Sequence, residues 1–345
     1  MQKKTVLDLF SGCGGLSLGF EQAGYEILLG IDHWNVALDT FQKNHPQAKT
    51  ACLDMSITQP KDVSETHNIN SVDVIIGGPP CQGFSISGKR NLDDPRNKLY
   101  QSFVNFVDYY QPSAFVMENV PNLVFMNDGK VRETIIQEFK DLGYSIAFKI
   151  LLASDYGVPQ NRKRVFFVGL KNGKEFKFPK GLFKDKHITS FEAIDDLPAR
   201  ELTDGEKYLS DATSEYQKIM RINSAHIYNH QLTKHTEKTK EIIALVPDGG
   251  NHKDLPENLR NTRNVNIAWT RLNSSRPSFT IDTGHNHHFH YKYNRVPTVR
   301  ESARIQSFPD DFIFTGRKNE QLKQVGNAVP PILSRNIALE LFNYL

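Results

Sequence analysis

The chain has 345 residues, of which 39% are hydrophobic and 23% charged, values typical of a folded globular protein and not of a disordered or collagen-like one. No apolar run approaches the roughly 18 residues of a membrane span, and the first apolar segment runs from Thr5 directly into Asp8 and a glycine cluster, which leaves no room for a signal peptide. We therefore expect no membrane association and a cytoplasmic location. The net charge of +3 is too small to identify a polyanionic partner.

Short apolar runs alternate with stretches of helical period over the first half of the chain. The strand candidates are Thr5 to Phe10, Glu26 to Ile31, Val72 to Ile76, Ala114 to Met117, Ser145 to Leu152 and Val165 to Leu170. Helical spacing follows from Leu99 to Tyr110 and from Val131 to Leu142, with Gly143 as a stop signal. This alternation predicts an α/β fold, a mostly parallel sheet with helices on both faces.

The alternation ends near Lys171. Lysines, prolines, histidines and asparagines then dominate, and turn signals cluster from Pro247 to Gly250. We expect a second, smaller and loop-rich domain here. It carries the whole charge excess, because residues 171–280 hold 18 Lys and Arg against 15 Asp and Glu, whereas the remainder holds 24 of each. Helical period returns from Ile332 to Leu345.

A glycine cluster, Asp8-Leu-Phe-Ser-Gly-Cys-Gly-Gly15, follows the first predicted strand. Gly12, Gly14 and Gly15 would let the backbone turn tightly and approach a ligand, and Asp32 near the end of the second strand could accept hydrogen bonds from ribose hydroxyls. The spacing differs from the G-x-G-x-x-G of dinucleotide sites. Since Asp8 could attract a cationic group, an adenosine with an amino-acid tail is favoured over NAD.

The segment Gly77-Gly-Pro-Pro-Cys-Gln-Gly-Phe-Ser85 follows another apolar strand. The two prolines cannot continue a central strand, so the chain leaves the sheet in a fixed direction and presents Cys81 where open α/β sheets place their active sites. A cysteine thiolate is a strong nucleophile. Three cysteines are too few for a disulfide framework, and we interpret Cys13 and Cys52 as buried apolar residues.

Six segments together resemble the DNA (cytosine-5)-methyltransferase family, and they occur in that family's order. They are Phe10-Ser-Gly-Cys-Gly-Gly15, Cys81 in its Pro-Pro-Cys context, Glu118-Asn-Val120, Gln160-Asn-Arg-Lys-Arg164, Arg300-Glu-Ser-Ala-Arg-Ile-Gln306 and Gln324-Val-Gly-Asn-Ala-Val-Pro330. The resemblance covers the chain from Val6 to Pro330 except for the middle segment, and it suggests the compact bacterial type with a Rossmann-like methyltransferase domain.

The resemblance implies a mechanism and its residues. Carbon 5 of cytosine is a weak nucleophile, so Cys81 would first add to carbon 6 and form an enamine. Glu118 would contact N3, and Arg164 would contact O2 with Arg162 beside it, stabilising the charge that develops on the ring. The base that removes the carbon 5 proton is a side chain or a water.

The resemblance also implies S-adenosylmethionine as cofactor, with S-adenosylhomocysteine as product. The implied contacts are Phe10, Gly12, Gly15, Leu16, Asp32, His33, Asp54, Met55, Pro80, Leu99, Asn327 and Val329. A larger aromatic often stands where this chain has His33, so either His33 or the adjacent Trp34 would stack on adenine.

A cytosine inside a duplex cannot reach such a site and must be flipped out. The segment from Gln82 to Lys98 resembles the family's mobile loop that closes over DNA, with Gln82, Ser85, Ser87, Lys89, Arg90 and Arg96 as DNA-binding candidates. In the middle segment, residue types that contact phosphates or base edges are Arg260, Arg263, Asn264, Trp269, Arg271 and Arg276, although surface arginines are usually only solvated. The run from His285 to His290 lacks partner cysteines, so we expect no metal site.

We expect residues 1–178 to form the catalytic S-adenosylmethionine-binding domain, residues 179–316 the target-recognition domain and hinge, and residues 317–345 to complete the catalytic domain. The leading hypothesis is a monomeric modification methyltransferase of a restriction-modification system, acting on double-stranded DNA, with a cognate restriction endonuclease as a possible partner. The alternatives are a tRNA cytosine-5 methyltransferase, a catalytically silent DNA-binding regulator, and an NAD oxidoreductase, which offers no role for Cys81 with Glu118.

Overall fold

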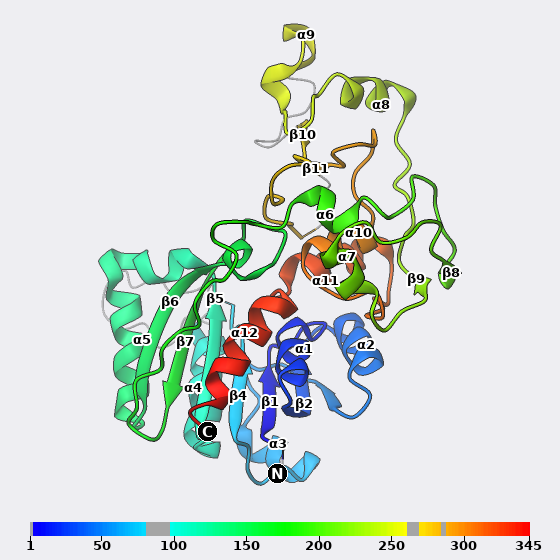
Figure 1. Cartoon of the computed structure of the whole chain (residues 1–345). Coiled ribbons are helices and arrows are strands. Elements are labelled where there is room, and N and C mark those ends of the chain that lie inside the picture. Colours follow the sequence, from blue (N-terminus) through cyan, green and yellow to red (C-terminus); the bar gives the residue numbers. More distant parts are fainter. Residues whose placement is uncertain (1–2, 81–96, 261–268, 284–287) are drawn as a thin grey trace. The chain divides into compact units, whose positions relative to one another are not determined.

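The computed structural model describes residues 3–80, 97–260, 269–283 and 288–345. The chain divides into two compact units (Figure 1). The first unit comprises residues 1–152, 163–180 and 333–345, and the second comprises residues 153–162 and 181–332. The functional boundaries expected from the sequence, at residues 178 and 316, stay a prediction.

The first unit is built on a seven-stranded sheet with the order β3-β2-β1-β4-β5-β7-β6. The strands are β1 (Thr5–Leu9), β2 (Glu26–Asp32), β3 (Lys49–Cys52), β4 (Val74–Gly77), β5 (Ala114–Asn119), β6 (Ser145–Leu152) and β7 (Lys163–Leu170). The first five are mutually parallel, and β7 runs antiparallel to both β5 and β6. The carboxyl ends of β1, β2, β4 and β5 therefore meet at one edge, as the sequence predicts for the active site.

Helices cover both faces of this sheet. They are α1 (Gly15–Gln22), α2 (Asn35–Asn44), α3 (Pro60–His67), α4 (Asn97–Tyr110), α5 (Lys130–Asp141) and α12 (Pro331–Phe342), with the 3-10 segment η1 (Pro121–Gly129) after β5. Strand side chains alternate between the faces. Leu29 and Ile31 of β2 join the large apolar core, whereas Gly30 between them leaves room for the Phe41 ring of α2 on the other face.

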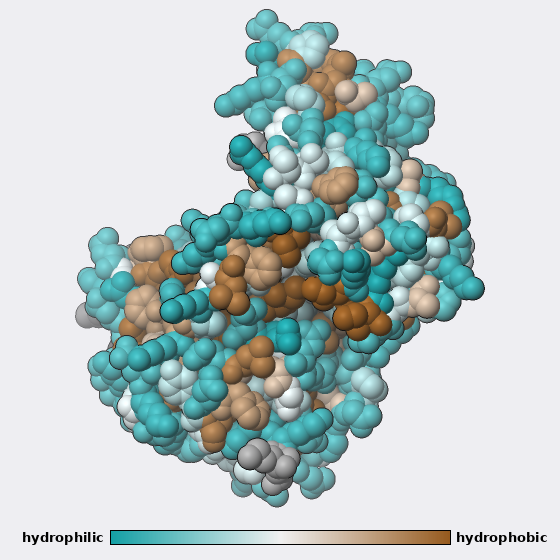
Figure 2. Space-filling model, viewed as in Figure 1, coloured by the Kyte–Doolittle hydropathy of each residue, from teal (hydrophilic) through white to brown (hydrophobic). Residues whose placement is uncertain are grey.

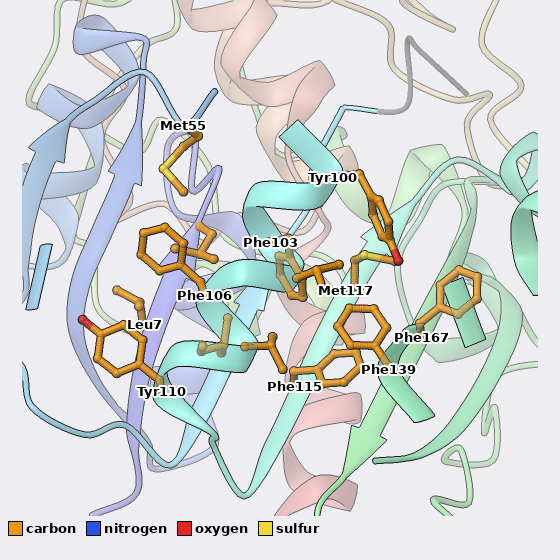
Figure 3. Close-up of a cluster of buried hydrophobic side chains, with 14 of the residues drawn as sticks. Leu7, Met55, Tyr100, Phe103, Phe106, Tyr110, Phe115, Met117, Phe139 and Phe167 are labelled. Atoms are coloured by element: carbon orange, nitrogen blue, oxygen red, sulfur yellow. The ribbon is translucent and has the colours of Figure 1, made fainter. Parts of the chain in front are cut away.

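The large core lies between the sheet and α4 with α5. Figure 3 shows Phe103, Phe106 and Tyr110 of α4 among side chains of the strands and of α5. The rings of Phe115 in β5 and Phe139 in α5 pack in a tilted arrangement, with their centroids 4.1 Å apart. Since each fully buried aromatic side chain contributes about 1.5–3 kcal/mol, this cluster rigidly fixes the strand ends that carry the site.

The last helix, α12, packs beside α1 on the opposite face of the sheet (Figure 1). Ser334 Oγ donates to the carbonyl of Leu16 at 2.6 Å, and Tyr25 Oη donates to that of Ala338 at 3.1 Å. A Cβ on Gly19 would lie 2.4 Å from Ser334 Cβ, so only glycine permits this approach. The two ends of the chain thus build one unit.

The second unit consists of short elements joined by long loops. Its helices are α6 (Ser190–Ile194), α7 (Glu215–Arg221), α8 (Glu237–Ala244), α9 (Glu257–Arg260), α10 (Val299–Ile305) and α11 (Lys318–Asn327), with 3-10 turns η2 (Ala153–Tyr156) and η3 (His252–Asp254). Two small sheets pair β8 (Glu206–Lys207) with β9 (His226–Ile227) and β10 (Thr270–Arg271) with β11 (His288–Phe289). This matches the loop-rich second domain expected from the sequence.

A buried ionic network holds the middle of the second unit. Arg304 of α10 makes a bidentate contact with Asp310, at 2.7 and 2.6 Å, and a further bond of 2.8 Å to Asp196. All three side chains are fully buried. Burial alone would raise the pKa of Asp310, but the Arg304 guanidinium lowers it below its usual value. This network joins α10, the loop that follows it and the loop that follows α6.

Two candidate DNA contacts of the middle segment are buried instead. Trp269 packs into an apolar cluster with Ile243 and Phe289, and Arg271 donates to the carbonyls of Ile243 and His290. Because these side chains are occupied inside the unit, we assign them no contact with nucleic acid. Arg276 and Arg260 are exposed, and Arg263 and Asn264 lie outside the described residues.

The face of the molecule shown in Figure 2 is mostly hydrophilic, with hydrophobic residues in small groups, as on most protein surfaces. Among the helices that the structure describes, none combines the length and apolar character that crossing a membrane requires.

Candidate active site

The glycine cluster forms a tight turn between β1 and α1. The backbone is left-handed at Phe10 (φ 61°), Gly12 (φ 53°) and Gly14 (φ 91°), and Gly15 begins the helix. A Cβ on Gly14 would lie 2.3 Å from Nε2 of the buried His45, so this position requires glycine for space as well as for φ. No described atom lies within 4 Å of the Cβ position of Gly12, which leaves room beside that turn.

Asp32 ties this turn to the end of β2. Its Oδ2 accepts from the Gly12 amide and its Oδ1 from the Trp34 amide, both at 2.9 Å. Both carboxylate oxygens therefore already accept a hydrogen bond from a backbone amide. A hydrogen bond from a ribose hydroxyl would be an additional one. His33 is exposed, with Nδ1 3.3 Å from Asp32 Oδ1, and Trp34 is half-buried at the start of α2.

Asp8 lies beneath the turn and is completely buried. Its Oδ2 accepts from Ser17 Oγ at 2.6 Å, whereas its Oδ1 has no hydrogen-bond partner among the described residues. Burial raises the pKa of Asp8 to about 8, helped by the nearby Asp32 charge and opposed by the Ser17 hydroxyl. Asp8 is thus largely neutral at pH 7, which corrects the expectation that its charge attracts a cationic group.

Four further cofactor candidates of the first unit lie after β3, on α4 or on α1. Asp54 is exposed, and its Oδ1 accepts from the Ser56 amide at 2.9 Å; hydrogen bonds from Ser56 lower the pKa of its carboxyl. Met55 is buried in the core and Leu99 packs against it. Leu16 is buried on α1.

The two free cysteines of the described residues differ in environment. Cys13 is buried, as expected. Cys52 is exposed, which corrects the expectation of a buried residue. The reason is its place at the end of β3, the edge strand of the sheet, where its Sγ lies 3.6 Å from the carbonyl oxygen of His33.

The chain leaves β4 through Gly77, Gly78, Pro79 and Pro80, next to the end of β5. Asn119 Nδ2 donates to the Pro79 carbonyl at 2.7 Å in a buried position, and Asn119 Oδ1 accepts from the Val120 amide. Asn119 therefore fixes the segment that leads to residue 81. The sequence of the Glu118-Asn-Val120 motif did not predict this role of Asn119, because the contact joins residues 40 positions apart.

Glu118 and Arg164 meet beside this segment. Arg164 Nε lies 2.9 Å from Glu118 Oε1, and the two side chains are only 16% and 13% exposed. A Cβ on Gly78 would lie 3.0 Å from Glu118 Oε2, so the glycine keeps space in front of the carboxylate. The structure thus brings together two of the four catalytic candidates, as a partly desolvated ion pair at the active edge.

Arg162, the third described catalytic candidate, belongs to the second unit. Its guanidinium is buried in the second unit and donates to the carbonyls of Gly326 (2.7 Å) and Ile281 (3.2 Å). Because these bonds direct its charge to backbone oxygens, we withdraw the catalytic assignment of Arg162.

Several candidates cannot be placed. Cys81 and the DNA-binding candidates Gln82, Ser85, Ser87, Lys89, Arg90 and Arg96 lie outside the described residues, and Pro80 is exposed just before them. Asn327 and Val329 belong to the second unit, with Asn327 exposed and Val329 buried, so their part in cofactor binding stays a prediction.

Comparison with known proteins gives the same family as the motifs. The model of the family described as "C-5 cytosine-specific DNA methylase" matches residues 4–343. The type II methyltransferase M1.HphI of Haemophilus parahaemolyticus is 40% identical over 97% of this chain and 85% of its own length. The type II methyltransferase M.DdeI of Desulfomicrobium norvegicum is 38% identical over 97% of this chain and 87% of its own.

Solved structures agree. A protein described as a DNA modification methyltransferase encoded within an E. coli prophage has a TM-score of 0.82 at 28% identity, covering 99% of both chains. The S. pombe Dnmt2 methyltransferase, at 16% identity, a TM-score of 0.62 and 99% coverage of both chains, shares the fold. With a family model matching nearly its whole length, this chain belongs to the C-5 cytosine-specific DNA methylases, enzymes of the DNA (cytosine-5-)-methyltransferase class.

Proposed function

We propose that the protein methylates carbon 5 of a flipped-out cytosine in a short duplex DNA site, as the modification enzyme of a type II restriction-modification system. The observation that carries this proposal is the Glu118–Arg164 pair, partly desolvated and 2.9 Å apart, beside the glycine-proline segment that leads to Cys81. The type II names of two relatives near 40% identity support the restriction-modification context.

S-adenosylmethionine fits the turn between β1 and α1. Gly12 leaves space beside the turn, Asp32 holds the turn at the end of β2, and Asp8 keeps a buried oxygen without a described partner. When bound, this cofactor supplies an electrophilic methyl group. We propose Phe10, Gly12, Gly15, Leu16 and Asp32 as its contacts, with His33, Asp54, Met55, Pro80, Leu99, Asn327 and Val329 completing the set.

Three residues act on the cytosine in this proposal. The Cys81 thiolate adds to carbon 6, which pushes electron density toward N3 and O2 and makes carbon 5 nucleophilic. Glu118 shares a proton with N3 and Arg164 faces O2, so the charge that develops on the ring meets a shared proton and a cation. After methylation, a base removes the carbon 5 proton and the Cys81 sulfur leaves as thiolate.

Duplex DNA must release the target base at a cost of a few kcal/mol. We propose that the polar and basic residues from Gln82 to Arg96 contribute to this step by contacting the DNA around the flipped base. We further propose that the protein acts as a monomer in the cytoplasm. Its partner would be a restriction endonuclease that recognises the same DNA site.

Bisulfite sequencing of genomic DNA from cells that express the protein tests this function. We expect one short sequence to carry a protected cytosine throughout the genome, and no protection in cells expressing Cys81→Ser. Protection confined to tRNA would favour the RNA-methylating alternative, and no protection in either nucleic acid, with DNA binding retained, would favour a silent regulator.

A further inference from the structure

Two buried side chains hold the backbone on either side of Asn327. Arg162 Nη2 donates to the carbonyl of Gly326 at 2.7 Å, and Gln306 Nε2 donates to that of Ala328 at 2.5 Å. Arg162 and Gln306 are both almost completely buried, whereas Asn327 between the two held carbonyls is exposed. At the end of α11, the backbone around Asn327 is therefore held in place, while the Asn327 side chain is exposed.

The two holding side chains are themselves connected. Gln160 Nε2 donates to Gln306 Oε1, and Gln160 Oε1 accepts from the Ile281 amide at 2.9 Å. The Ile281 carbonyl in turn accepts from Arg162 Nη1 at 3.2 Å. Gln160, Arg162 and Gln306 thus form one buried set, which we call the amide clamp, and the contacts named above lie within the second unit.

Gly326 shows how closely the clamped segment is packed. A Cβ at this position would lie 2.0 Å from the carbonyl oxygen of Asp282, a distance that no real Cβ tolerates. The turn from Gly326 to Ala328 is therefore confined from one side by the backbone at Asp282 and from both ends by charged or amide donors.

We propose that Arg162 and Gln306 are positioning residues that hold Asn327 in its cofactor-binding orientation. The proposal rests on the proposed function, in which Asn327 contacts S-adenosylmethionine. It also gives the two arginines of the Gln160-Asn-Arg-Lys-Arg164 segment different tasks. Arg164 contacts the cytosine, whereas Arg162 affects cofactor binding indirectly, by holding the backbone of residues 326–328.

The test compares Arg162→Lys with Arg164→Lys, the same change two residues apart. A lysine at 162 can reach only one of the two carbonyls, so we expect the dissociation constant for S-adenosylhomocysteine, measured by titration calorimetry, to rise about tenfold. The turnover number at saturating cofactor should stay within about twofold of wild type. For Arg164→Lys we expect the reverse, a lower turnover number with unchanged affinity.

A double-mutant cycle separates positioning from general destabilisation. Asn327→Ala should weaken S-adenosylhomocysteine binding on its own, and adding Arg162→Lys should then cost much less than tenfold, because the clamp acts through Asn327. Gln306→Met, which removes the amide but keeps the volume, provides a second variant should Arg162→Lys prove poorly folded, and should weaken binding in the same direction.

Two outcomes would contradict these ideas separately. Wild-type affinity in both Arg162→Lys and Gln306→Met, or fully additive effects with Asn327→Ala, would overturn the positioning role alone. A wild-type protein that binds no S-adenosylhomocysteine would contradict the proposed function, and the positioning role with it.

Discussion

At the scale of single residues, the Glu118–Arg164 pair is the part of the site that the structure defines best. The proposed chemistry needs a proton at N3 of the cytosine and a cation at O2, and the two groups that can supply them lie 2.9 Å apart with little exposure to water. Low exposure strengthens such interactions, because water screens them less. The pair is thus arranged before any substrate arrives.

Glu118→Gln tests this arrangement. Glutamine keeps the size of the side chain but cannot hold an acidic proton at N3, so we expect the turnover number to fall by about 10² or more, as is typical when a proton donor is lost. Single-turnover methylation of an oligonucleotide duplex measures this, and S-adenosylhomocysteine affinity should remain that of wild type. Turnover within a few fold of wild type would remove Glu118 from the chemistry.

Asp8 gives a pH dependence with a definite sign. Its pKa is raised from 3.8 to about 8, so the folded state binds the proton more tightly than the unfolded chain does. The resulting stabilisation is complete below pH 3.8 and is lost as the pH rises toward and through 8. Asp8→Asn keeps the acceptor for Ser17 and removes the ionisation.

We therefore expect the wild type to lose more thermal stability between pH 6 and pH 9 than Asp8→Asn does, as measured by calorimetric melting temperatures. Parallel melting curves for the two proteins over this range would show that Asp8 ionises normally in the folded state.

At the scale of elements, strong apolar runs were predictable and weak ones were not. The predicted strand Ser145 to Leu152 coincides with β6, and Ala114 to Met117 lies within β5. The edge strand β3 has only Ala51 buried, so its sequence carries no strand pattern. Helix α1 was not predicted either, because its start is rich in glycine and glycine is a poor helix former.

The sequence predicted the positions of those site residues that lie at the carboxyl ends of strands. Glu118 is the penultimate residue of β5 and Asp32 is the last residue of β2, so both lie at the carboxyl edge of the parallel strands. Arg162 and Arg164 are two residues apart, a spacing that would place them on one face of a strand. However, β7 begins only at Lys163, so the alternation does not extend to Arg162. Its guanidinium donates to Ile281 and Gly326, which are more than 100 positions away, and no local pattern reveals such contacts.

The contact between α12 and α1 gives a prediction at this scale. Ser334 is fully buried and satisfies the Leu16 carbonyl, so Ser334→Ala should lower the free energy of unfolding by about 1–3 kcal/mol because a buried acceptor loses its donor. Urea denaturation measures the change. Leu339→Ala, at an exposed position of the same helix, is the control and should change the free energy far less.

At the scale of the whole molecule, each unit has its own buried apolar residues, and the second also contains the fully buried ionic network around Arg304. Asp310→Asn removes one charge from this buried network and should cost about 3–5 kcal/mol, because breaking a buried pair leaves charge uncompensated. Asp311→Asn, at the exposed neighbour, should cost little.

The pH dependence of this effect has the opposite sign to that of Asp8. The pKa of Asp310 is lowered in the fold, so its stabilisation is present above pH 3.8 and is lost as the pH falls through the lowered value. Thermal melting between pH 2 and pH 5 checks this, and equal losses for wild type and Asp310→Asn in acid would contradict it.

The central claim is that Cys81 bonds covalently to the target cytosine. A duplex carrying 5-fluorocytosine at the target tests this most directly, because fluorine cannot leave as the proton does and the adduct persists. We predict a complex stable to denaturing electrophoresis with the wild type and S-adenosylmethionine, its cross-linked peptide containing residue 81, and none with Cys81→Ser. An equally stable complex with Cys81→Ser, or no complex with a wild-type protein that methylates the unmodified duplex, would contradict the account.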